Sequence, residues 1–141
     1  MVKRVADAQW NGDLQNGSGE IALGSGAFKG PFSYKSRFED GTGTNPEELI
    51  AGAHAGCFSM ALSFALAQGG HPATSVKTRA TVNFGPVPGG FAISRIELTT
   101  HGQVAGIDAA TFQKFAADAK ANCPVSKALA GVEITLKAAL V

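Results

Sequence analysis

The chain has 141 residues, enough for one domain over residues 1–141 whose core needs no disulfide or metal to hold it. Hydrophobic residues make up 45% of the chain and charged residues 16%, a balance that excludes intrinsic disorder. The 12 Lys and Arg residues nearly balance the 11 Asp and Glu residues, so the charge favours no nucleic-acid partner.

The first part of the chain predicts three strands joined by turns. Residues 3–10 alternate loosely in polarity, and Asn-Gly-Asp follows as a turn signal. Residues 18–23 and 31–38 are typical of two more strands, and alternation in the second places Arg37 on the face opposite Ser36 and Phe38. The basic residues near the start have no long apolar stretch behind them, so we expect no signal peptide.

A long helix is predicted over residues 46–68. Asn45 suits the N-cap, Pro46 suits the first helical position, and Glu47 and Glu48 lie in the first turn. The helix is apolar nearly all round, which is more surface than one small domain readily covers, so we expect a partner chain. Its apolar region also contains a histidine, two serines and two glycines, which favours a buried soluble helix over a membrane span.

The second half of the chain predicts two strands, two helical segments and a final strand. Residues 74–84 and 91–104 alternate well and indicate an antiparallel pair with a longish connection. Asp108 caps a helix over 109–121, a helical turn follows over 124–130, and 132–141 ends the chain as a strand. This order indicates an α+β fold and not a βαβ alternation.

Two cysteines, Cys57 and Cys123, are too few for a disulfide scaffold or a cysteine-rich zinc site. We expect a cytoplasmic chain, where a cysteine pair is more often catalytic or incidental than structural. Cys57 lies in the middle of the long helix and, taken alone, suits a small core position. Cys123 precedes Pro124 as the expected N-cap of the short helix, a position that lowers a thiol pKa. If the two helices pack together, one thiol can attack a substrate and the other can resolve the product.

A peroxide-reducing cysteine also needs a cation that stabilises its thiolate, and Arg37 is the natural candidate. Glu48 fits the capping-box position, which leaves Glu47 free to hold the arginine. Glu47 and Cys57 are separated by roughly 15 Å along one helix, a gap that two helices crossing antiparallel in a dimer would close.

Two other function classes remain open from the residues. His54 stands one turn before Cys57 and would serve as the base of a Cys–His hydrolase, but no oxyanion hole or orienting Asn or Asp is evident. A lone histidine on an apolar helix is more often a core residue. Alternatively, the cysteine pair is a redox sensor, or the chain binds a small apolar ligand without turnover. Only a peroxidase consumes many equivalents of peroxide when a dithiol is supplied.

Five segments carry a resemblance to a known family. They are SRFEDG at 36–41, TNPEELI at 44–50, HAGCFSMAL at 54–62, GIDA at 106–109 and CPVS at 123–126. Together they span most of the chain and closely resemble the osmotically inducible protein C (OsmC) family. The CPVS motif is closer to the OsmC branch than to the organic hydroperoxide resistance (Ohr) branch. One departure is Gly56, where the family pattern leads us to expect alanine; it loosens the helix by up to about 1 kcal/mol.

The resemblance implies a thiol-dependent peroxidase that reduces organic hydroperoxides, and hydrogen peroxide too. It implies that Cys57 is peroxidatic, that Cys123 is resolving, and that Arg37 and Glu47 complete the site. It further implies an intertwined homodimer with antiparallel sheets wrapped around long central helices. An external dithiol serves as reductant, and we expect no metal, organic cofactor, nucleic acid or membrane among the partners.

Overall fold

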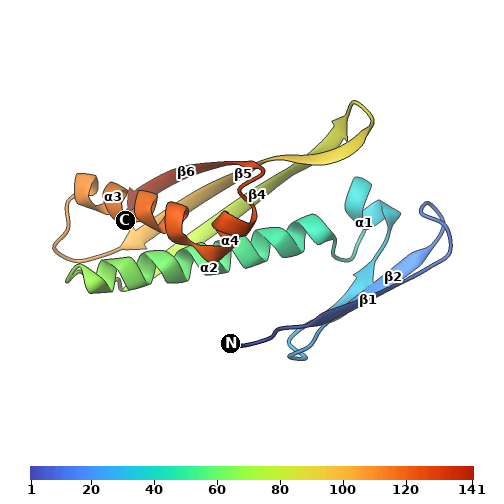
Figure 1. The fold of residues 1–141 in the computed structure, drawn as a ribbon, viewed down its shortest axis with the longest axis horizontal. Coiled ribbons are helices and arrows are strands. Elements are labelled where there is room, and N and C mark those ends of the chain that lie inside the picture. The colour runs from blue at the N-terminus through green and yellow to red at the C-terminus, as the bar shows by residue number, and fades with distance from the viewer. The chain divides into compact units, whose positions relative to one another are not determined.

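The computed structural model describes residues 1–141, which form two compact units, Met1–Leu49 and Ile50–Val141. The elements run in the order β1–β2–β3–α1–α2–β4–β5–α3–α4–β6, and all but β3 are labelled in Figure 1. Each unit contains its own three-stranded sheet. The predicted α+β class is therefore confirmed.

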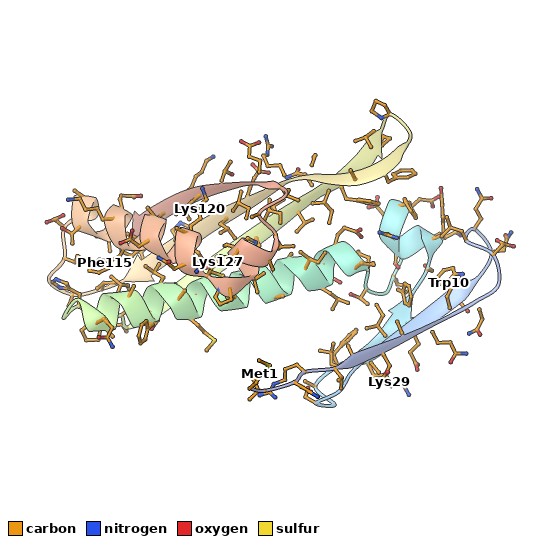
Figure 2. The ribbon with its side chains drawn as sticks, viewed as in Figure 1. Met1, Trp10, Lys29, Phe115, Lys120 and Lys127 are labelled. Carbon is orange, nitrogen blue, oxygen red and sulfur yellow. The ribbon has the colours of Figure 1, made fainter.

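The sheet of the first unit is an antiparallel meander of β1 (Ala6–Asn11), β2 (Ser18–Leu23) and β3 (Lys29–Phe32). On one face the ring of Trp10, labelled in Figure 2, packs against Phe32 with the ring centroids 5.3 Å apart. The side-chain carboxylate of Asp13 accepts the Asn16 backbone N–H in the β1–β2 turn. The turn predicted after the first strand is therefore present.

The predicted strand over 31–38 is wrong beyond Phe32, because the chain turns there into a short helix, α1 (Tyr34–Phe38). Ser33 and Ser36 form a reciprocal capping box, in which each side-chain oxygen accepts the other's backbone N–H. The rings of Tyr34 and Phe38 stack one turn apart, 4.7 Å between centroids. Arg37 therefore lies on a helix. An aromatic pair four residues apart suits one helix face as well as it suits alternation along a strand.

The second unit's sheet has the order β4–β5–β6, formed by β4 (Ser75–Val87), β5 (Gly90–Gln103) and β6 (Glu133–Leu140). β4 and β5 form an antiparallel hairpin longer than predicted, closed by Pro88 and Gly89, whose φ of +87° favours glycine. β6 pairs parallel to β5, so this sheet is mixed, where the resemblance implied antiparallel pairing. Parallel strands need a crossover, and α3 (Ala109–Asn122) and α4 (Pro124–Ala128) supply it.

The core of the second unit is formed by α2 (Pro46–Gln68), β5 and α3. Its fully buried members are Phe58, Leu62, Leu66, Ile96, Leu98, Phe112, Ala116 and Ala119. The predicted cap of α3 is confirmed, because the Asp108 carboxylate accepts the Thr111 N–H at 2.7 Å. At the far end of α2, the ring of Phe115 (Figure 2) meets His71 edge-on. This packing holds α2 and the α3–α4 junction together, which sets the position of the candidate site.

The opposite side of α2 carries an exposed apolar surface. Met60 is 76% exposed and Phe64 is 66% exposed, with small residues around them. We call the following set the exposed α2 face: Gly52, Ala53, Gly56, Met60, Phe64 and Ala67. By length and hydropathy α2 could cross a membrane. However, Phe58 and Leu62 on it are fully buried among the side chains of the second unit, as in the core helix of a soluble protein.

Candidate active site

In the first unit, an ion pair joins α1 to the start of α2. Arg37 donates from its terminal guanidinium nitrogen to Glu47 Oε1 at 2.8 Å, and its Nε donates to both carboxylate oxygens at 3.2 and 3.3 Å. The Glu47 side chain is 10% exposed and the Arg37 side chain is 36% exposed, so the carboxylate is the better shielded end of the pair. A charge held by several hydrogen bonds in this way has a fixed orientation.

Polar contacts order the chain that precedes α2. They involve the residues on either side of Glu47 and leave its carboxylate for the arginine. The Glu48 N–H donates to Asn45 Oδ1 at 2.8 Å, so the predicted N-cap is confirmed. The Asn45 amide in turn donates to the Ser36 carbonyl, tying α1 to the cap. Glu48 does not reach back to the cap backbone; its carboxylate accepts the Thr44 hydroxyl at 2.8 Å.

In the second unit, the two cysteines face each other. The sulfur atoms of Cys57 on α2 and Cys123 at the α3–α4 junction lie 2.7 Å apart, only a little farther than the S–S bond of about 2.05 Å in a disulfide. Cys123 is fully buried, whereas Cys57 is partly exposed. Cys123 ends α3 and is also the N-cap of α4, with Pro124 at the first helical position as predicted. A thiol that reacts at Cys57 therefore has its partner thiol already in contact.

The two thiols have different acidities. Burial raises the pKa of Cys57, and the contact with Cys123 raises it further. Burial also pushes the pKa of Cys123 upward, but Cys57 and the backbone and hydroxyl of Ser126 more than offset this, so that pKa is lowered. The two thiols titrate as a coupled pair, in which the surroundings of Cys123 favour the negative charge more than those of Cys57 do. A thiolate at Cys57 therefore needs an additional cation nearby.

A second polar contact between α2 and α4 lies beside the thiols. His54 is fully buried, and its Nε2 lies 2.7 Å from Ser126 Oγ, while its Nδ1 has no hydrogen-bond partner. Burial lowers the pKa of His54, so the imidazole is neutral at neutral pH. Sequence reasoning missed Ser126; its position three residues after Cys123 in the CPVS motif was the available signal.

Cys57 opens into a pocket of about 970 Å³ formed by α2, α3 and the start of α4. The side chains around it are mostly apolar, with Met60 and Phe64 on one side and the polar groups of Asp118 and Asn122 on another. This lining suits the alkyl part of an organic substrate better than a highly charged one. The structure thus places Cys57 with Cys123 at a pocket in the second unit, and Arg37 with Glu47 in the first unit.

Comparisons with known proteins point in one direction. The sequence model of the family described as "OsmC-like protein" matches residues 39–137. The chain is 46% identical over 136 residues to the Peroxiredoxin OsmC of Escherichia coli (strain K12), covering 96% of this chain and 94% of that protein. It is 38% identical over 98 residues to the organic hydroperoxide resistance protein of Xanthomonas axonopodis pv. citri (strain 306), covering 68% and 67%. Among solved structures, the organic hydroperoxide resistance protein OhrB of Bacillus subtilis superposes with a TM-score of 0.71 at 25% identity, covering 95% of this chain and 97% of that one.

Proposed function

Because the chain belongs to the family of OsmC-like proteins, we propose that its peroxidase cycle runs on Cys57 and Cys123. The protein is a cysteine-based, thiol-dependent peroxidase that acts on organic hydroperoxides. The observation that carries the proposal for the two residues is the 2.7 Å contact between the thiols at the edge of an apolar pocket. One thiol there is reachable by substrate and the other is shielded from it.

The cycle has three steps that balance in atoms and electrons. The Cys57 thiolate attacks the outer oxygen of the hydroperoxide, the O–O bond breaks, and the alkoxide takes a proton and leaves as alcohol. Cys57, oxidised by two electrons, is now a sulfenic acid. Cys123 attacks its sulfur, so that an S–S bond forms and hydroxide leaves, to be protonated to water. An external dithiol then reduces the disulfide by two successive exchanges.

Arg37, held by Glu47, is the cation that we assign to the Cys57 thiolate and to the charge developing on the leaving oxygen. Glu47 and Cys57 stand ten residues apart on α2, roughly 15 Å along the axis, so the pair is not well placed for Cys57 of its own helix. We assign it instead to Cys57 of the partner subunit in a homodimer. Each protomer then contributes to both sites.

The exposed α2 face is the surface that we assign to this homodimer. Because Met60 and Phe64 also line the pocket at Cys57, the second copy would form the outer wall of that pocket. Burying Met60 and Phe64 against a second copy would contribute about 1.5–3 kcal/mol for each side chain. The small residues on the same face allow close approach of a second helix. Residues 1–141 then act as one domain whose two units are completed in an intertwined dimer. The setting is cytoplasmic, where external dithiols are available and a disulfide does not persist.

The direct test of the function is peroxide consumption with a dithiol in excess. We expect many equivalents of an alkyl hydroperoxide to be consumed per chain, at a rate at least equal to that with hydrogen peroxide, because the pocket lining is apolar. Peroxide assays with and without dithiol measure this. Consumption that stops at about one equivalent per chain, with dithiol present, would indicate a redox sensor instead.

Sharing of the site between protomers predicts complementation between two inactive variants. Arg37→Ala is expected to lose on the order of a hundredfold in kcat/KM, and Cys57→Ser to lose turnover. In a heterodimer formed by refolding the two together, the intact Arg37 faces the intact Cys57, so one site per dimer recovers. Activity of the purified heterodimer close to half that of wild type is the expected result. A heterodimer as inactive as its parents would show that Arg37 acts on its own chain.

A further inference from the structure

The peroxidase cycle leaves one buried titratable group unused, the imidazole of His54. It is fully buried in an apolar setting, yet it makes one short contact, 2.7 Å from Nε2 to Ser126 Oγ. Burying a polar group lowers the free energy of unfolding unless hydrogen bonds replace those it made with water. Ser126 is itself buried, so water does not replace either partner.

Two parallel contacts connect α2 to the α4 turn. On α2, His54 and Cys57 are three residues apart and so share one face of the helix. At the start of α4, Cys123 and Ser126 are also three residues apart. His54 meets Ser126 at 2.7 Å and Cys57 meets Cys123 at 2.7 Å. The histidine contact therefore fixes the same pair of elements whose separation determines whether the thiols touch.

Either partner of the His54–Ser126 bond can supply its hydrogen, because a neutral imidazole has one N–H and a serine hydroxyl both donates and accepts. His54 Nδ1 has no partner, so the bond to Ser126 is the one that orients the ring. The bond joins α2 to α4 whichever atom donates.

Building on the two-cysteine cycle, we propose that His54 and Ser126 are positioning residues for the resolving step. Their hydrogen bond joins α2 to α4 three residues from each thiol, and so holds Cys123 against Cys57. As a thiolate, Cys123 attacks the sulfur of the oxidised Cys57. In that step the S–S bond forms, the S–O bond breaks, and hydroxide leaves with the electron pair and is protonated to water.

The test follows disulfide formation in the full two-cysteine chain after one equivalent of peroxide. We expect this step to slow with Ser126→Ala and with His54→Leu, and to stay near the wild-type rate with His54→Gln, because the glutamine amide retains a hydrogen-bonding group for the serine hydroxyl. Ser59→Ala is the matched control, since it removes a hydroxyl contact to Thr78 from the same helix.

The size of the effect follows from the loss of one buried hydrogen bond. Ser126→Ala is expected to slow disulfide formation about tenfold, while oxidation of Cys57 stays as fast as in wild type. An unchanged rate of disulfide formation in Ser126→Ala overturns the proposal, and so does an equal loss in the rate of Cys57 oxidation. A His54→Gln rate as low as that of His54→Leu overturns the role of the bond to Ser126. If wild type itself consumes no peroxide, the peroxidase assignment fails instead.

Discussion

Replacing Cys57 with serine is expected to abolish peroxide turnover. A serine hydroxyl at neutral pH is neither ionised nor nucleophilic enough to open an O–O bond, and the other cysteine is fully buried with no direct opening to the pocket. The loss should reach the detection limit, at least about a thousandfold in kcat/KM, which corresponds to about 4 kcal/mol of transition-state stabilisation. Stopped-flow mixing of the variant with an alkyl hydroperoxide, in the presence of dithiol, measures it.

The fold should tolerate this substitution, because serine and cysteine have similar shapes and Cys57 is only partly buried. We expect the free energy of unfolding to change by less than about 1 kcal/mol. The Ser59→Ala variant, which alters the next-but-one residue on α2, should keep wild-type turnover. Undiminished peroxide consumption by a well-folded Cys57→Ser protein would remove Cys57 from the mechanism.

Replacing Cys123 with serine is expected to separate the first chemical step from the rest of the cycle. Cys57 remains able to attack, so about one equivalent of peroxide per chain should be consumed rapidly. The sulfenic acid then has no thiol in contact and accumulates, because the contact at 2.7 Å is the route to the disulfide. Trapping with a cyclic diketone that adds to sulfenic acids, followed by mass spectrometry, should place the adduct on Cys57.

Steady-state turnover of Cys123→Ser should fall by about a hundredfold or more, since each cycle must wait for an external thiol to find a partly shielded sulfenic acid. Excess peroxide should then drive Cys57 to the sulfinic acid, which is not reversed by thiols. Wild-type turnover in this variant, with no trapped adduct, would assign resolution to a group other than Cys123.

The parts of the fold that sequence predicted correctly have local causes. The start of α2 follows from Asn45 and Pro46, and both act within one turn of the helix. The cap of α3 by Asp108 is equally local. By contrast, the polarity pattern around Arg37 suits a strand as well as a helix, and the reciprocal bond between Ser33 and Ser36 is what favours the helix. The parallel pairing of β6 depends on the crossover through α3 and α4, which no short window of sequence reveals.

The candidate site shows the same difference between features with local causes and features that depend on long-range packing. Each of Cys57, Cys123, Arg37 and Glu47 was identified by its residue type and its neighbours in the chain. The contact between His54 and Ser126 was not predicted, because the two residues are 72 positions apart and nothing local to either one indicates the other. Its appearance beside the thiols is a product of how α4 packs on α2.

The spacing of the two thiols also has a consequence during protein synthesis. Cys57 and Cys123 are 66 residues apart, and the α3–α4 junction that carries Cys123 lies far along the chain. At ordinary elongation rates Cys57 leaves the ribosome roughly 3 to 13 s before its partner. Over that interval an oxidised Cys57 has no thiol of its own chain with which to condense, and repair depends on thiols in solution. The resolving half of the cycle therefore becomes available only after the α3–α4 junction has been made and has packed on α2.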